Sequence, residues 1–248
     1  MRHSVELTLA RLAVRQFLGS RRALWVLVLA ALPILLAVLL RADNGSDPGE
    51  TVDDFVGMFQ ALIVSVLLPI VALVVGTSVF GSEVDDGTIT YVLGKPVPRW
   101  RIVATRMVVA GLVTAAVLVP STLLATLVGL RGLEEQRMAW GFTVAVAAGS
   151  LLYCALFVAL SLSTRRALVA GLAYVVVWEG LLSRTFGGSR ALSIREYTMS
   201  IADSLVDTRN PLSRLDVRTA LIMAAVVAAL ATFHSIRRLR TFEIGEAV

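Results

Sequence analysis

The chain has 248 residues, of which 57% are hydrophobic and 17% are charged, and its formal net charge is +5. Its mean hydropathy is +0.80. Soluble domains are roughly half apolar, so this composition excludes a soluble globular protein and indicates an integral membrane protein.

Residues 1–22 predict a cytoplasmic helix that lies along the membrane surface. On a helix from Ser4 to Arg22, apolar residues cover most of the circumference. The polar residues share one narrow arc, formed by Ser4, Thr8, Arg11, Arg15 and Arg22. Such a basic amphipathic helix directs its arginines toward lipid phosphates. It serves either as a lipid anchor or as a lever against a cytoplasmic partner.

Six apolar segments follow, and each reaches or approaches the length of a transmembrane helix. A helix crosses roughly 30 Å of hydrocarbon with about 20 residues. The predicted spans are about 23–40, 57–80, 106–130, 140–163, 167–182 and 217–236. Unbroken apolar runs differ from the short alternating strands of a β-barrel. The predicted fold class is therefore an all-α membrane protein with a six-helix domain over residues 23–236.

The first span is predicted to be an uncleaved helix, and the alternative is a signal peptide. Its apolar run is 18 residues long, and no small-x-small cleavage site follows before Arg41. The run is longer than the apolar region of a typical signal peptide.

The arginines orient the chain, because basic residues near span ends stay on the cytoplasmic side. Basic residues gather before the first span and after the second, fourth and sixth spans, whereas acidic residues crowd 43–54 and 134–135. Both termini are therefore predicted to face the cytoplasm, with 237–248 as a tail. The last outer loop, 183–216, holds five arginines and departs from the rule.

The charged loop 81–101, between the second and third spans, is predicted to form a short rigid knob. Gly87 supplies a flexible residue and Thr88 an N-cap hydroxyl, so a short helix begins there. Gly94 ends it, and two prolines keep the following chain extended. Acidic residues lie on the entry side and basic residues on the exit side: Glu83, Asp85 and Asp86, and Lys95, Arg99 and Arg101.

The sequence argues against catalysis by this chain. Its one lysine, Lys95, lacks the surrounding glycine and Ser/Thr of a phosphate-binding P-loop. The histidines, His3 and His234, are far apart in sequence, and Cys154 is alone, so no zinc-ligand spacing exists. No Gly-x-Ser-x-Gly elbow is present. We therefore expect no catalytic residue and no metal site.

The loop pattern Glu83, then Gly87-Thr88, then Pro96-Val97-Pro98-Arg99, leading into the third span, resembles the type-2 permease family of ABC transporters. The six predicted spans and the amino-terminal helix agree with it. The likeness covers most of the chain and includes the multidrug and copper-enzyme-maturation permeases. Pro98 stands where the family often has serine, which stiffens the turn.

The resemblance implies that this chain is the permease subunit of a bacterial ABC exporter in the cytoplasmic membrane. In the family, loop 81–101 is a coupling helix that docks on a separate ATPase subunit, which holds ATP and Mg. The implied docking residues are Glu83, Asp86, Gly87, Thr88, Tyr91, Leu93, Pro96, Arg99 and Trp100. The implied assembly has two ATPase copies and a second permease subunit, identical or different, in the lipid bilayer. Nucleic acid is not an expected partner.

Two further features have alternative interpretations. The turn with Arg165 and Arg166 is a second, smaller cytoplasmic contact, or its arginines only set the topology. Glu179 lies near the outer end of the fifth span, next to Trp178. It either pairs with Arg184 or Arg190 at headgroup level, or it takes part in substrate passage or gating.

The outer loop 183–216 predicts one amphipathic helix on the outer surface, because Ile194, Tyr197, Ile201 and Leu205 have helical spacing. The sequence does not identify the transported substrate. Similar proteins transport drugs, antimicrobial peptides, lipids and factors for copper-enzyme maturation. An alternative function is a membrane scaffold or signalling anchor that binds a cytosolic protein through loop 81–101.

Overall fold

The computed structural model describes residues 21–43, 48–85, 99–164, 166–183, 187–206 and 211–241, and these residues contain helices and connecting turns but no strand. The amino-terminal helix predicted within residues 1–22 therefore lies almost entirely outside the described residues, as does most of the tail 237–248.

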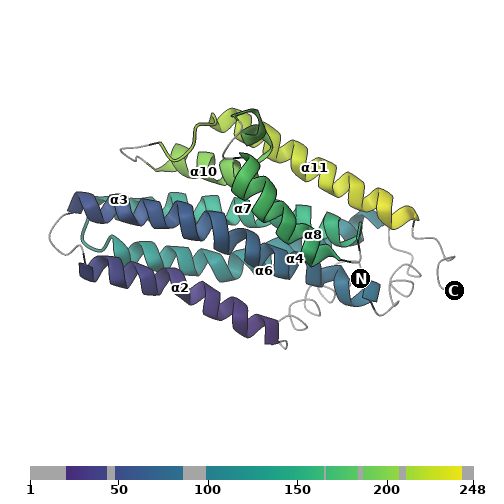
Figure 1. Cartoon of the computed structure of the whole chain (residues 1–248), viewed down its shortest axis with the longest axis horizontal. Coiled ribbons are helices and arrows are strands. Elements are labelled where there is room, and N and C mark those ends of the chain that lie inside the picture. The colour runs from purple at the N-terminus through teal and green to yellow at the C-terminus, as the bar shows by residue number, and fades with distance from the viewer. Residues whose placement is uncertain are drawn as a thin grey trace, which may run out of the picture.

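The described residues of the first half form three long helical rods. Helix α2 covers Arg21–Asp43. A continuous rod follows, made of α3 (Pro48–Met58), the π-helix η1 (Phe59–Leu67) and α4 (Leu68–Asp85). Helix α6 covers Arg99–Gly129. Figure 1 shows these rods running roughly antiparallel, so that the end of α4 and the beginning of α6 lie at the same end of the bundle.

The second half adds one central helix, several short helical pieces and a second long helix at its end. The 3₁₀ turn η2 (Glu134–Arg137) leads into α7 (Met138–Ser161). The fifth predicted span consists of α8 (Ala167–Ala173) and the π-helix η3 (Tyr174–Leu182). The 3₁₀ turn η4 (Gly187–Leu192), α10 (Ile194–Leu205) and α11 (Val217–Thr241) complete the fold.

Among the described residues, four helices are long and apolar enough to cross a membrane: Gly49–Ser78, Trp100–Gly129, Glu134–Ser161 and Val217–Leu239. They correspond to the predicted second, third, fourth and sixth spans. The other two predicted spans are shorter apolar helices, Val28–Ala42 and Ala167–Leu182. The protein is therefore an all-helical, multi-pass membrane protein.

The second rod begins earlier than the predicted span, within the acidic stretch assigned to the first outer loop. Pro48 opens α3, and its fixed φ suits the first turn of a helix. Asp53 and Asp54 are exposed, whereas Val52 and Phe55 are buried. The acidic residues thus occupy the outward face of an amphipathic turn.

The core is centred on α7, which packs against α6, α4, α10, α11 and α8. Phe142 of α7 stacks on Phe59 of η1 with ring centroids 4.0 Å apart, and Phe55 lies beside it at 6.2 Å. Helix α11 lies on the outside of the bundle (Figure 1), and its buried side is lined by small residues, Ala220, Ala224, Ala231 and Ser235, with Leu239 in the last turn.

Small residues allow the closest helix contacts. A Cβ atom added at Gly111 of α6 would lie 2.5 Å from Cδ2 and 3.1 Å from Cα of Leu151 in α7. Within a bilayer, helices associate through such close packing because lipid supplies no hydrophobic driving force between them. In contrast, a Cβ atom added at Gly57 would meet nothing within 4 Å.

We predict that Gly111→Ala lowers the stability of the protein by about 1–3 kcal/mol, because the added methyl group overpacks the interface between α6 and α7. The thermal midpoint in detergent measures this effect. Gly57→Ala is the matched control and is expected to leave the midpoint unchanged or raise it slightly. Equal midpoints for the two variants would contradict the close α6–α7 contact.

A second prediction concerns topology. If all six apolar helices cross the membrane, a cysteine at Glu134 reacts with a membrane-impermeant maleimide in intact cells, whereas a cysteine at Arg166 reacts only after permeabilisation. The native Cys154 is buried, so unmodified protein serves as the blank. Labelling of position 166 in intact cells would contradict the predicted cytoplasmic placement of the turn between the fourth and fifth spans.

Candidate functional site

Most of the predicted coupling loop lies outside the described residues. This holds for Asp86, Gly87, Thr88, Tyr91, Leu93 and Pro96. The borders are described: Glu83 lies in the last turns of α4, and Arg99 begins α6. Because α4 and α6 pack against each other, a force on the loop acts on two helices in mutual contact.

The exit of this loop carries an exposed aromatic residue. The Trp100 side chain is 53% exposed, and the guanidinium of Arg101 lies 5.5 Å from the centre of its ring. An arginine over a tryptophan ring is an attractive cation–π pair. An exposed tryptophan at the end of an apolar helix is typical of a membrane interface.

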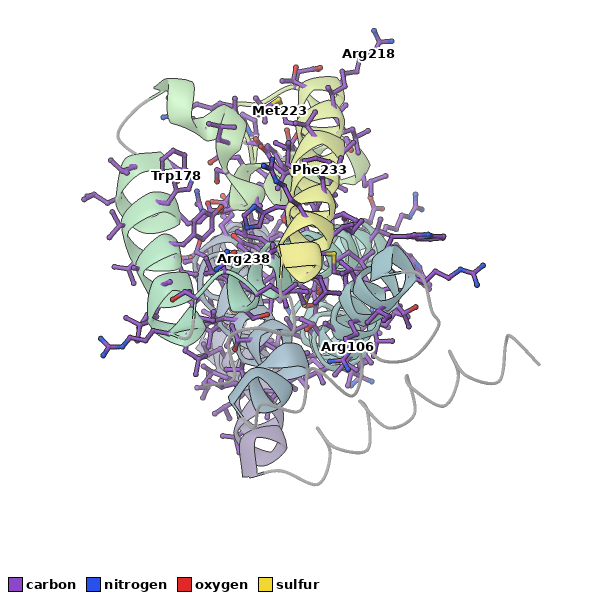
Figure 2. The ribbon with its side chains drawn as sticks, turned by 90° about the vertical axis from the view of Figure 1, so that its right-hand side faces the viewer. Arg106, Trp178, Arg218, Met223, Phe233 and Arg238 are labelled. Carbon is purple, nitrogen blue, oxygen red and sulfur yellow. The ribbon has the colours of Figure 1, made fainter. Side chains whose placement is uncertain are left out.

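The turn between α7 and α8, the predicted second contact, is connected to α11. Ser163 Oγ lies 2.8 Å from Nε2 of His234, and Nε of Arg238 donates to the carbonyl of Leu162 at 3.4 Å. Figure 2 shows Arg238 at this end of α11. Arg166 is exposed, whereas Arg165 lies outside the described residues. No sequence pattern indicates the roles of His234 and Arg238, because their partners are 71 and 76 residues away in the chain.

The clearest polar site in the described part of the apolar bundle surrounds Glu179. Its side chain is 3% exposed. The Tyr174 hydroxyl donates to Oε1 at 3.0 Å, and the backbone N–H of Ile194 donates to the same oxygen at 2.9 Å. The hydroxyl of Ser193 donates to Oε2. Tyr174 and Glu179 lie five residues apart on η3, and the wider turn of a π-helix brings residues at this spacing to one side.

The carboxylate of Glu179 lies at the amino-terminal end of α10. Ser193 caps that helix, because its hydroxyl accepts from the backbone N–H of Glu196 at 3.2 Å. The first turn of a helix presents unpaired N–H groups and the positive end of the helix dipole, both of which favour an anion. An isolated carboxylate within lipid is unfavourable by about 2–3 kcal/mol or more. The site compensates for this with three donors and the dipole.

These contacts differ from one of the two predicted alternatives for Glu179, a pairing with Arg190 at headgroup level. Among the described residues, the hydrogen bonds of the Glu179 side chain go to Tyr174, Ser193 and Ile194, and Arg190 is not one of the partners. Arg184 lies outside the described residues. Ser193 and Ile194 were not identified from the sequence, although Ser193 before an amphipathic run with Glu196 three residues later is a recognisable N-cap signal.

The predicted amphipathic helix 194–205 is present as α10, and it is packed into the bundle instead of lying exposed on the protein surface. Its buried residues include Ile194, Tyr197, Met199, Ile201 and Ala202, and the helix packs against α7 and α11. Helix α10 lies very close to α7, because α7 has a glycine at the contact. A Cβ atom added at Gly149 of α7 would lie 2.6 Å from Oγ1 of Thr198. The apolar face that the sequence indicates therefore meets protein.

A second set of polar contacts connects α10 to η1. Nε of Arg195 donates to Oγ of Ser65 at 2.7 Å, and that hydroxyl donates to the carbonyl of Gln60 at 2.6 Å. Arg195 also pairs with Glu196 at 3.1 Å, and Glu196 accepts from Ser213 at 3.2 Å. Helix α10 is thus bonded to both π-helices, and π-helical turns occur frequently at functional sites.

The segment before α10 is fixed by two aromatic donors. Nε1 of Trp178 donates to the carbonyl of Leu192 at 3.2 Å, and the hydroxyl of Tyr197 donates to the carbonyl of Ala191 at 2.6 Å. Burial of its ring, and secondarily the charge of Glu179, raise the pKa of Tyr197 to about 12. The phenol therefore keeps its proton at physiological pH and remains a donor. Within the described residues, no group of three or more His, Cys, Asp or Glu side chains is placed to hold a metal ion.

A model of the ABC-2 family transporter proteins matches residues 7–182 of this sequence. The chain belongs to the ABC-2 transporter family. The matched region contains loop 81–101 and Glu179, and it ends before α10 and α11. No curated protein matches the sequence significantly.

Membership in the ABC-2 transporter family defines the class of activity. The ABC-2 permease family is a membrane transport component that does not itself perform catalysis, and it associates with an ABC ATPase. The resemblance identified from the loop motif is confirmed by the match. The individual docking residues and the role of Glu179 remain predictions.

We predict that Glu179→Ala lowers stability by about 2–4 kcal/mol, because it leaves the half-buried Tyr174 donor and the buried Ser193 and Ile194 donors without their acceptor. Glu179→Gln keeps an acceptor oxygen and is expected to have a smaller effect. The measurement is the thermal midpoint in lipid nanodiscs. Asp53→Ala, which removes an exposed carboxylate, is the control. If Glu179→Ala and Asp53→Ala have the same midpoint, the Glu179 carboxylate does not stabilise the fold as proposed.

Proposed function

We propose that this chain is the permease subunit of a bacterial ABC exporter. In this proposal the substrate crosses by alternating access, powered by a separate ATPase subunit that holds the ATP and Mg. The complex lies in the cytoplasmic membrane and contains two ATPase copies and a second permease subunit, identical or different. All six apolar helices cross the bilayer, with both termini in the cytoplasm.

The observation that carries this proposal is the family match over 176 of 248 residues, which contains the whole of loop 81–101. The structure supports it through the helices that border the loop. Helices α4 and α6 pack on each other, and both pack on the central helix α7. A displacement of the loop therefore reaches the middle of the bundle through three packed helices, which suits rigid-body transmission.

The proposed role of the loop is that of a coupling knob. Closure of the ATPase pair on ATP pushes the knob, and the knob displaces α4 and α6. The docking residues are the acidic entry residues, the Gly87-Thr88 helix start and the Pro96-to-Trp100 exit. The turn between α7 and α8 provides a smaller second contact, braced by His234 and Arg238 of α11.

The alternative is a membrane scaffold or signalling anchor that uses the same loop to hold a cytosolic protein. Both functions predict binding through loop 81–101, but transport alone predicts that the bound protein is an ATPase whose turnover rises in the complex. Co-purification followed by an ATPase assay in lipid distinguishes them. A bound partner without nucleotide hydrolysis would favour the scaffold.

We predict that Glu83→Arg reduces co-purification of the ATPase at least tenfold, because it reverses a charge on the proposed docking surface. The readout is the amount of ATPase retained by the tagged permease and its turnover in nanodiscs. Glu134→Arg makes the same reversal at the opposite end of the bundle, where Glu134 is exposed, and should change neither. Unaltered assembly of the Glu83 variant would make the loop a simple connector.

A further inference from the structure

The carboxyl-terminal end of α11 is held against the turn between α7 and α8. His234 contacts the hydroxyl of Ser163, and Arg238 donates to the carbonyl of Leu162. These two bonds join residues that are 71 and 76 positions apart in the chain. They therefore fix which side chains of the two segments lie together at this end of the bundle.

Three exposed arginines meet at this junction, and we call them the arginine cluster: Arg166, Arg237 and Arg238. Arg166 precedes α8 and follows Leu162, which Arg238 contacts, by four positions. Positions 234, 237 and 238 are spaced three and four residues apart, so they share one face of α11. Figure 2 shows Arg238 between α11 and the helix that carries Trp178. The cluster thus combines cationic groups from two separate elements.

The elements that carry the cluster contain no acidic residue. The sequence has no Asp or Glu from 136 to 178, which includes α7, α8 and the turn between them, and none from 217 to 242, which includes α11. The charge that these elements contribute here is therefore positive. A guanidinium group binds a phosphate through two parallel hydrogen bonds, so a phosphate group is complementary to this surface.

Exposed apolar side chains continue from the cluster along both helices. Val169 and Leu172 of α8 are exposed. On α11, Phe233 and Leu230 are exposed, one and two turns before Arg237. A surface with cationic groups at one end and apolar side chains beyond them suits an amphiphile that has an anionic head and hydrocarbon tails.

We propose that the arginine cluster binds the phosphate of an anionic phospholipid, such as phosphatidylglycerol, in the leaflet at this end of the bundle. The guanidinium groups donate to the phosphate oxygens, and the acyl chains lie along the exposed faces of α8 and α11. A basic residue near an anionic membrane surface contributes about 1 kcal/mol, or about fivefold in binding.

The fixed geometry separates this site from a general topology signal. The rule that keeps basic residues in the cytoplasm applies to each arginine by itself. The bonds of His234 and Arg238 add a defined arrangement, because they hold α11 to the turn that Arg166 follows. Helices α8 and α11 both pack on α7, so a lipid bound to both adds a link between them. This inference goes beyond the proposed function, since it requires no ATPase.

The test compares two lipids on the full chain without the ATPase. The purified protein is placed in detergent micelles that contain equal amounts of phosphatidylglycerol and phosphatidylcholine, which differ in net charge. Native mass spectrometry then counts the lipids of each kind that stay bound. The readout is the ratio of retained phosphatidylglycerol to phosphatidylcholine, and we expect at least tenfold for the unmodified protein.

The cluster variant replaces all three arginines, as Arg166→Gln, Arg237→Gln and Arg238→Gln. It is expected to lower the ratio at least tenfold, because three contributions of about fivefold are lost. The same three positions changed to lysine keep their charge and are expected to retain most of the preference.

The matched control removes three exposed arginines at the other end of the helices. Arg131 and Arg137 lie between α6 and α7, and Arg218 lies at the start of α11. Their replacement by glutamine changes the net charge by the same amount and is expected to leave the ratio as it is in the unmodified protein.

The proposal is overturned if the unmodified protein retains both lipids equally, or if the cluster variant and the control lower the ratio by the same factor. It is also overturned if the cluster variant keeps the ratio but no longer co-purifies with the ATPase, because the arginines would then contact that protein. The thermal midpoint verifies folding. If loss of the bond from Arg238 to Leu162 prevents folding, the double variant Arg166→Gln and Arg237→Gln replaces it, with an expected drop of at least fivefold.

The lipid measurement contains no ATPase, so its failure is distinguishable from failure of the proposed transport function.

Discussion

A polar group inside a bilayer has no water to bond, and the architecture of this protein depends on that constraint. It explains why the described chain consists of helices and turns, whose backbone groups bond within the chain. It also explains the hydroxyl groups of α7: Thr143, Ser150 and Ser161 are buried, and each donates to a carbonyl three or four residues earlier. Ser121 of α6 likewise donates to the carbonyl of Ala30 in α2.

The same constraint gives Glu179 its significance. A carboxylate at this depth requires donors, and it takes them from three places: its own helix, the cap residue of α10 and the backbone of α10. Because the carboxylate needs these donors, the fifth apolar helix is bonded to the start of α10, which follows it in the chain. A contact made for electrostatic compensation also fixes the relative position of these two elements.

The proposed coupling loop and the Glu179 site lie in different parts of the fold, and α7 joins them. Helices α4 and α6, which border the loop, pack on α7, and so do α8, α10 and α11. Glycines make these contacts close: Gly111 brings α6 onto α7, and Gly149 brings α10 onto it. A central helix packed this closely transmits displacement well, because densely packed interiors are not easily compressed.

The sequence by itself determined the membrane class, the approximate places of the apolar helices and the ABC-2 family, because lipid imposes long apolar runs and the loop motif is a local pattern. It also determined α10, whose helical spacing and N-cap signal are local. Only the tertiary structure decided that α10 is buried against α7, that Glu179 bonds α10 instead of Arg190, and that His234 meets Ser163. These contacts depend on which residues, distant in the chain, lie side by side, and hydrophobic periodicity marks an apolar face without naming its partner.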